Sequence, residues 1–168
     1  VVLTGAGRAF CAGFDLKEGA ATPKAGIADW RPIIQRDFDV IMRFWHLSRP
    51  TIAAVHGHCI AAGCELALAC DITIAAESAL FGEPELRFGS GIVCLILPWV
   101  IGLKQAKELL LTGDDKVDAL RAASMRFCAT LMYFPSRSMP IKSRPSILAT
   151  APVVPVPKNG SSTTSPGF

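Results

Sequence analysis

Short β-branched runs alternate with helical patterns in the first half of the chain, and this alternation restricts the possible folds more than any other feature. Residues 1–4, 51–55 and 72–74 are each typical of a short buried strand. Residues 30–45 and 61–69 lie between these runs and have the apolar spacing or composition of helices. Strands that alternate with helices predict an α/β fold, with 51–55 as a central strand because helical segments flank it.

Two of the helical segments carry further detail. One face of the amphipathic helix over 30–45 consists of four apolar residues, Ile34, Phe38, Ile41 and Trp45. The segment 95–111 is also apolar, but Pro98 and Gly102 interrupt it. We therefore predict two short helices there, the second over 103–111.

The composition predicts a globular chain. Of its 168 residues, 51% are hydrophobic and 18% are charged, which is enough apolar material for a core. The longest apolar run, 91–102, contains Pro98 and is shorter than the roughly 20 residues of a membrane-spanning helix. The six cysteines lie in apolar runs, so we predict free thiols and a reducing, cytoplasmic location. Because the first residue is Val1 rather than methionine, an upstream organellar targeting segment stays open.

Charge divides the chain into two regions. The net charge of +3 arises from +6 over residues 119–168, which contain no acidic residue, and −3 over residues 1–118. The second region is rich in proline and serine, so we predict a partial core over 1–118 and a divergent, poorly ordered tail over 119–168. An acidic core without a basic, aromatic surface also argues against nucleic acid as a partner.

Two kinds of site are disfavoured by spacing. Gly5 and Gly7 begin like a dinucleotide-binding fingerprint, but Phe10 occupies the position of its third glycine. His56 and His58 could share a face of a strand, yet the histidines and cysteines match no established metal-ligand spacing. We predict neither a nucleotide-redox site nor a metal site.

Two turns of small residues are better candidates for chemistry. Each follows a strand, at 11–14 and at 61–64, and the second opens a helix. Free N–H groups at a helix start, with one more from another loop, can form an oxyanion hole that stabilises negative charge on a carbonyl oxygen. Either turn on its own could equally be a tight connection without function.

Two glutamates add an acid–base possibility. Glu65 lies near the start of an otherwise apolar helix, where a buried carboxylate is costly unless it is paired. Glu85 follows Pro84 twenty residues later. Two carboxylates in an apolar cleft can hold a water between them, one accepting and one donating a proton. For Glu85 considered by itself, an exposed charge at a helix start is the simpler interpretation.

Taken in order, four segments closely resemble the crotonase (enoyl-CoA hydratase/isomerase) superfamily. They are FCAGFDLK at 10–17, PTIAAVHG at 50–57, AAGCELALACD at 61–71 and FGEPE at 81–85. The resemblance covers residues 1 to about 118 and implies a crotonase-like spiral of ββα turns, truncated at both ends. It also implies a homotrimer or hexamer that binds acyl-coenzyme A thioesters.

The resemblance assigns roles to four residues at the reacting centre. The backbone N–H groups of Phe14 and Ala62 fall where the family forms its oxyanion hole, which grips the thioester oxygen. Glu65 and Glu85 fall on the two acid/base positions of the hydratases. The glutamates would hold and deprotonate a water for attack at Cβ, Glu85 would return a proton to Cα, and the oxyanion hole would stabilise the enolate.

Four further positions correspond to substrate binding. Arg8 and Lys17 fall where family members place cations near the coenzyme A phosphates, although exposed cations are common on any protein. Ala12 and Asp15 lie in the same substrate-binding segment. Coenzyme A is part of the substrate in this family, so the resemblance implies no separate cofactor and no metal.

The sequence departs from the hydratases in two places. Residues 89–94 read GSGIVC, where hydratases commonly carry a proline- and glycine-rich segment ending in Thr-Gln-Arg. Beyond 118, Arg121 to Ala123 are similar to a family helix, but the remainder is not. The abrupt loss of acidic residues suggests an incomplete or frame-shifted gene product, which the sequence of the parent transcript would test.

Three functions are consistent with these observations. Both glutamates favour an enoyl-CoA hydratase that adds water across the α,β double bond. An enoyl-CoA isomerase or an acyl-CoA thioester hydrolase is the nearest alternative, because the oxyanion hole is shared across the superfamily. A non-catalytic fragment that at most binds acyl-CoA is the third.

Overall fold

The structure is a computed structural model, and it describes residues 1–17, 24, 26–128 and 130–132. All of these belong to the first of two compact units, residues 1–135. Of the predicted tail over 119–168, residue 129 and residues 133–168 lie outside the described residues. Within the described part, no helix is both long and apolar enough to cross a bilayer.

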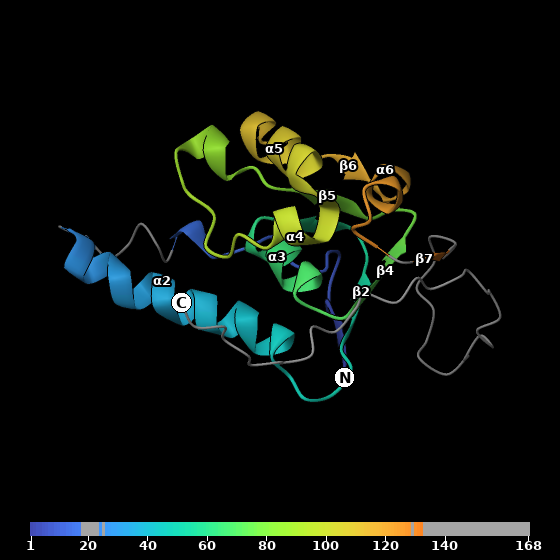
Figure 1. The fold of residues 1–168 in the computed structure, drawn as a ribbon, viewed down its shortest axis with the longest axis horizontal. Coiled ribbons are helices and arrows are strands. Elements are labelled where there is room, and N and C mark those ends of the chain that lie inside the picture. Colours follow the sequence, from blue (N-terminus) through green and yellow to red (C-terminus); the bar gives the residue numbers. More distant parts are fainter. Residues whose placement is uncertain (18–23, 25, 129, 133–168) are drawn as a thin grey trace, which may run out of the picture. The chain divides into compact units, whose positions relative to one another are not determined.

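Four parallel strands form the larger sheet, in the order β1 (Val2–Thr4), β2 (Ile52–Val55), β4 (Ile72–Ala76) and β7 (Thr130–Met132) (Figure 1). The predicted central strand is confirmed, because β2 pairs with β1 on one side and β4 on the other. Ala53 and Val55 on β2 are almost fully buried. Parallel neighbours require crossover connections, which the helices supply.

The first strand is less buried than its sequence predicts. Val1 and Val2 keep 58% and 66% of their surface exposed. The reason is position, because β1 is at the edge of the sheet among the described residues and pairs only with β2. A β-branched run identifies a strand but does not tell an edge strand from a central one.

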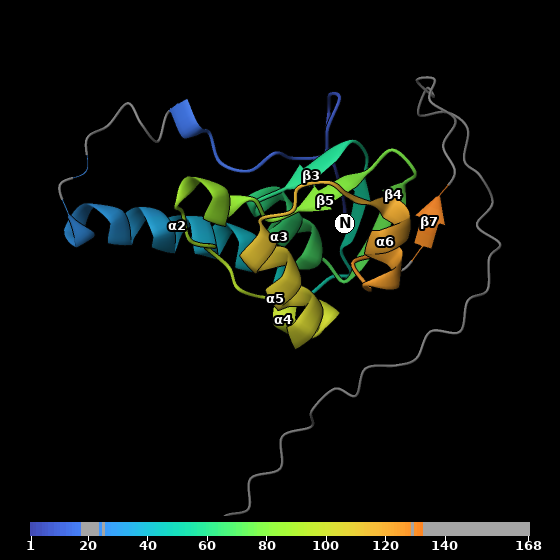
Figure 2. The same cartoon turned by 90° about the horizontal axis from the view of Figure 1, so that it is seen from above.

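A smaller sheet is formed by segments for which the sequence predicts no strand. It contains β3 (His58–Ile60), β5 (Leu80–Gly82) and β6 (Val117–Asp118), and Figure 2 shows β3 and β5 side by side. Gly57 turns the chain from β2 into β3 with φ +57°, and a Cβ there would strike the carbonyl oxygen of Arg8. The chain thus passes from a strand of one sheet to a strand of the other and then into a helix.

Four of the described helices agree well with their predicted positions, whereas the last, α6 (Ala119–Ser124), lies in the region that was predicted to be a poorly ordered tail. The four are α2 (Ile27–Trp45), α3 (Ala62–Leu68), α4 (Leu97–Ile101) and α5 (Leu103–Thr112). Gly102, at φ +87°, separates α4 from α5 as predicted. Of the four apolar residues on one face of α2, only Ile41 is buried, and the other three keep between 37% and 46% of their surface exposed.

The packed core continues past Asp118. The Asp118 side chain accepts a hydrogen bond from the Arg121 N–H at 2.8 Å and so caps α6. Ala119 and Ala122 on α6 are buried, and the Phe127 ring packs against Phe81 with ring centroids 5.6 Å apart. The described fold therefore extends beyond the predicted core boundary.

Candidate active site

The start of α3 consists of small residues because the turn at 11–14 packs against it. Gly63 lies so close to Cys11 that a Cβ there would strike the Cys11 carbonyl oxygen and lie 2.8 Å from its Cβ. The Cys11 carbonyl also accepts a hydrogen bond from Ile60 N–H at 3.1 Å, which ties the first turn to β3. The two small-residue turns of the sequence thus contact each other.

The contact continues at Gly13. Its φ of +94° is in the region that favours glycine, and a Cβ there would lie 2.9 Å from Ala61 Cβ and 3.5 Å from Ala62 N. Ala62 is the first residue of α3, so its N–H has no acceptor within the helix. Neither Ala62 nor Phe14 donates its N–H to a backbone carbonyl among the described residues. Two free amides therefore lie on adjoining turns.

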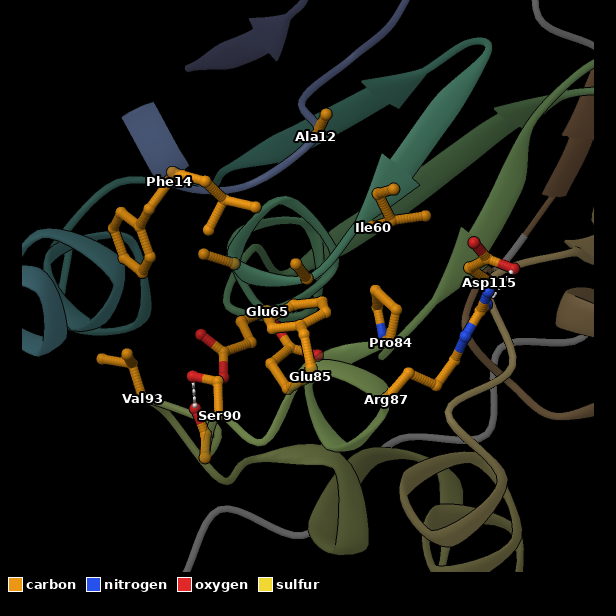
Figure 3. A pocket seen from close by; sticks show the side chains of 15 residues that line it. Ala12, Phe14, Ile60, Glu65, Pro84, Glu85, Arg87, Ser90, Val93 and Asp115 are labelled. Carbon is orange, nitrogen blue, oxygen red and sulfur yellow. Dashed lines mark hydrogen bonds and ion pairs between the residues drawn. The ribbon is translucent and has the colours of Figure 1, made fainter. Parts of the chain in front are cut away.

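A pocket of about 510 Å³ opens beside these turns (Figure 3). Five of the predicted site residues line it: Ala12, Phe14, Ala62, Glu65 and Glu85. Arg8, Asp15 and Lys17 are exposed and are not among the lining residues. The Lys17 N–H donates to the Asp15 carboxylate at 2.8 Å, which shapes the chain just after the first turn.

Glu65 lies in the first turn of α3. It is 1% exposed, and its Oε1 accepts a hydrogen bond from Cys94 N–H at 2.9 Å. Its Oε2 has no hydrogen-bond partner among the described residues. Burial, together with the nearby Glu85, raises the pKa of Glu65 to about 7. The divergent segment 89–94 thus supplies a direct hydrogen-bond partner to Glu65.

Glu85 reaches the same pocket from a different element. It begins the 3-10 helix η1 (Glu85–Phe88) directly after Pro84, and it is 8% exposed. Figure 3 shows the Glu65 and Glu85 side chains next to each other in the pocket. Burial raises the pKa of Glu85, while hydrogen bonds from its own N–H and from the Glu83 carboxyl lower it. The structure therefore brings the two predicted acid–base residues together.

Sequence reasoning missed Glu83. It follows β5, it is 1% exposed, and burial raises its pKa well above the usual value. A signal was present, because Glu83 stands two residues after Phe81 and alternation along a strand places such residues on one face. Phe81 is fully buried, and Glu83 is directed to the interior with it.

Arg87 is a second residue that the sequence analysis did not single out. It is the one cation among the residues that line the pocket, and it forms an ion pair with Asp115 at 3.0 Å. The pair is partly exposed, so it contributes little to stability. Figure 3 shows Arg87 next to Asp115 among the side chains that line the pocket.

His56 and His58 lie at the start of the smaller sheet, at β3 and in the turn before it. The ring Nε2 of His56 lies 3.0 Å from the Gly7 carbonyl oxygen, in hydrogen-bond contact. Within the described ranges, no group of three histidine, cysteine or acidic side chains is arranged to hold a metal ion. All six cysteines are free thiols, and all except Cys11 are buried, as their apolar surroundings predicted.

Comparisons with known proteins identify the family. The sequence pattern of the enoyl-CoA hydratase/isomerase family matches residues 1–125. A mevalonyl-coenzyme A hydratase of Beauveria bassiana is 42% identical over 120 residues, which are 67% of this chain and 43% of that protein. Related proteins in Dictyostelium discoideum and Arabidopsis thaliana are named as mitochondrial and peroxisomal, respectively. The chain spans about half the length of the curated relatives that it matches.

Solved structures agree. An enoyl-CoA hydratase/isomerase from Xanthobacter autotrophicus Py2 superposes with a TM-score of 0.77 at 55% identity, over 79% of this chain and 49% of that one. An enoyl-CoA hydratase from Bacillus anthracis gives a TM-score of 0.72 at 35% identity, over 79% of this chain and 51% of that one. These matches confirm the predicted α/β, crotonase-like fold. The chain belongs to the enoyl-CoA hydratase/isomerase family.

Proposed function

We propose that this chain carries the reacting centre of an enoyl-CoA hydratase. The observation that supports this most directly is the arrangement of Glu65 and Glu85, two buried carboxyl groups from different elements that line one pocket. Two such groups can share the acid and base roles that water addition requires. The adjoining turns at Phe14 and Ala62 line the same pocket.

In this proposal the thioester carbonyl oxygen accepts hydrogen bonds from the N–H groups of Phe14 and Ala62. These donors stabilise the negative charge that develops on the oxygen when the substrate becomes an enolate. The amides are suited to this because backbone groups on packed turns need little reorganisation. The absence of a Cβ at Gly13 and Gly63 allows the two turns to approach each other closely, so that both amides can act on one atom.

The proton transfers are assigned to the glutamates. Together they hold the water, and one of them, as carboxylate, accepts a proton from it while the oxygen bonds to Cβ of the substrate. Glu85 then returns this proton to Cα, so that the elements of water are added across the double bond and both carboxyl groups end as they began. A Glu65 pKa of about 7 suits this role, because a group close to the working pH can exchange a proton readily in either direction.

Substrate binding is proposed for the segment that leads into the first turn. Ala12 lines the pocket, and Arg8, Asp15 and Lys17 lie on the exposed parts of the same segment, where cations could meet the coenzyme A phosphates. Coenzyme A enters as part of the substrate, with no separate cofactor. A cytoplasmic location remains a prediction from the buried free thiols, and a homotrimer or hexamer remains one from the family resemblance.

An isomerase or thioester hydrolase is the second candidate, and the segment 89–94 favours it. Ser90, Gly91 and Val93 from this segment line the pocket, and they differ from the residues that hydratases commonly carry there. Either reaction would use the same oxyanion hole with a different division of work between Glu65 and Glu85.

The test is hydration of a short 2-enoyl-CoA by the chain, with calorimetric titration of an acyl-CoA in parallel. Glu65→Gln and Glu85→Gln should each lower turnover by roughly 10²–10⁴ while acyl-CoA binding survives, because an amide keeps its size but does not exchange the proton. Glu77→Gln is the matched control, since Glu77 is exposed.

Three other outcomes of this experiment would each support a different conclusion. A rate loss confined to Glu65→Gln would favour the isomerase or thioester hydrolase. Wild-type hydration rates in both variants would overturn the acid–base assignment. Acyl-CoA binding without hydration, isomerisation or hydrolysis would identify a non-catalytic binder.

A further inference from the structure

Glu83 is a buried carboxyl group that the proposed reaction does not use. Only 1% of its surface is exposed, and it is not among the residues that line the pocket. No backbone N–H or hydroxyl group of the described residues donates a hydrogen bond to either of its carboxyl oxygens. A carboxylate without donors is very costly in such a place, so the group must be neutral or paired.

The backbone around Glu83 holds its position firmly. Its N–H donates to the Asp114 carbonyl at 3.1 Å, and the carbonyl of the preceding Gly82 accepts from Ala61 N–H at 2.9 Å. Gly82 has no room for a Cβ, because Asp114 and Asp115 pass directly over it. The chain therefore cannot turn the Glu83 side chain outward to water without breaking these contacts.

The ionisable groups that face Glu83 are carboxyl and thiol groups. They are Glu65 and Cys64 on α3, Glu85 on η1 and Cys59 on β3. Both Glu83 oxygens and Glu85 Oε2 are buried without a hydrogen-bond partner among the described residues, so a proton on one carboxyl group would allow it to donate to the other. No cation acts on Glu83 within the part of the chain that the structure describes. Burial keeps both thiols neutral, since it raises the pKa of Cys59 and of Cys64 well above the usual value.

Two carboxyl groups in hydrogen-bond contact inside a protein cannot both be ionised, because their like charges repel each other at short range. The proton goes to the group that is harder to solvate. Both oxygens of Glu83 are enclosed, whereas Glu85 lines the pocket and also receives a hydrogen bond from its own N–H. The shared proton therefore lies on Glu83, and its O–H donates to the Glu85 carboxylate.

We propose that Glu83 is a positioning residue for Glu85: it stays a neutral acid behind the pocket and, by donating its O–H, orients the Glu85 carboxyl and favours its ionised form. Glu83 itself touches no substrate. The catalytic meaning of this pair rests on the proposed function, but the location of the proton does not.

Carbon-13 NMR of the full chain with labelled glutamate carboxyls tests the location of the proton directly. Between about pH 3 and pH 6, where an ordinary glutamate side chain titrates, the Glu83 signal, identified by its loss in Glu83→Gln, should keep the chemical shift of a protonated carboxyl. Titration of Glu83 within this range in the folded protein would overturn the proposal.

Two substitutions of Glu83 then test its effect on Glu85. The measured quantity is the direction in which the titration midpoint of Glu85 changes. In Glu83→Gln the neutral amide still donates, so the Glu85 midpoint should stay within a few tenths of a pH unit. In Glu83→Leu the donor is lost, and the midpoint should rise by about 1–2 units. A fall of the midpoint in Glu83→Gln would show that a negative charge had been removed, and would therefore contradict a neutral Glu83.

Turnover gives a separate readout. If the chain hydrates enoyl-CoA, Glu83→Gln should keep its pH–rate profile, and Glu83→Leu should shift the acidic limb upward together with the Glu85 midpoint. A hydrating enzyme whose Glu83 titrates in the range of an ordinary glutamate would refute this inference and leave the proposed function intact. A chain without hydratase activity in which Glu83 stays protonated would refute the proposed function and leave this inference intact.

Discussion

At the scale of single residues, burial sets the protonation of three glutamates. Desolvation is the largest cause of the raised pKa at Glu65, Glu83 and Glu85, and no described cation offsets it. A raised carboxyl pKa means that the folded protein binds a proton more tightly than the unfolded chain does. These groups therefore couple stability to pH in the direction opposite to a salt-bridged carboxylate.

We predict that Glu65→Gln reduces this coupling. The Glu65 pKa rises from 4.5 to about 7 on folding, so its contribution to stability is complete below pH 4.5 and decreases as the pH rises through about 7. The amide keeps an acceptor for Cys94 N–H without a charge. The variant should gain up to about 3 kcal/mol relative to wild type at pH 8, but not at pH 4. Urea unfolding at both pH values measures this.

The control for that prediction is Glu77→Gln, which changes an exposed glutamate. It should not reproduce the gain in stability that Glu65→Gln shows at pH 8. An identical pH dependence in wild type and Glu65→Gln would show that Glu65 is solvated in the folded protein.

We also predict that Ala62→Pro lowers turnover by roughly 10²–10³ if the chain is an active hydratase, because one oxyanion donor is lost. Proline is tolerated at the first position of a helix, and Ala62 is the first residue of α3. Acyl-CoA binding and the circular dichroism spectrum should change little. A variant that keeps its structure and its full turnover would exclude Ala62 N–H as an oxyanion donor.

At the scale of elements, the site depends on the contact between the 11–14 turn and the start of α3. The turn is bound to β3 by hydrogen bonds of Cys11 with His58 and Ile60, both at 3.1 Å. Glycine at 63 lets the two segments meet without a side chain between them. The proposed oxyanion hole therefore exists only when these two elements are packed together.

We predict that Gly63→Ala destabilises the protein by about 1–3 kcal/mol, because its methyl group would strike Cys11. It should also reduce turnover, since the turns must separate. Gly7→Ala is the matched control, as a Cβ at Gly7 meets nothing within 4 Å. Thermal unfolding of both variants measures the difference, and equal stability would argue against a tight contact at Gly63.

At the scale of the whole molecule, residues beyond Asp118 help to close the core of the first unit. Phe127 is 2% exposed and stacks at a tilt against Phe81, which is fully buried. The buried face of α6 lies beside β5 and β6. The compositional boundary at 118 is therefore not a boundary of packing.

We predict that Phe127→Ala costs about 3–5 kcal/mol of unfolding free energy, because it leaves a large cavity against Phe81. Leu120→Ala, at a position that is 73% exposed, should cost less than about 0.5 kcal/mol. Denaturant unfolding of the two variants gives the comparison. A small effect at Phe127 would mean that the core ends where the acidic residues do.

The sequence by itself determined those parts of the protein that depend on neighbours along the chain. Periodicity located β2, β4 and the main helices, while Pro98 and Gly102 marked the break between α4 and α5. The assignment of Glu65 and Glu85 as an acid–base pair came from the family resemblance of the segments that contain them, and not from their spacing. Residues close in sequence share one element, so their pattern already contains this information.

Only the tertiary structure decided what depends on residues far apart in the chain. It placed β1 at an edge, paired β3 with β5 and left most of the apolar face of α2 exposed. It also enclosed Glu83, whose neighbours Cys64 and Glu85 belong to two other elements. Burial is a sum over contacts between distant segments, so the pattern around Glu83 could suggest its direction but not the absence of water that sets its protonation.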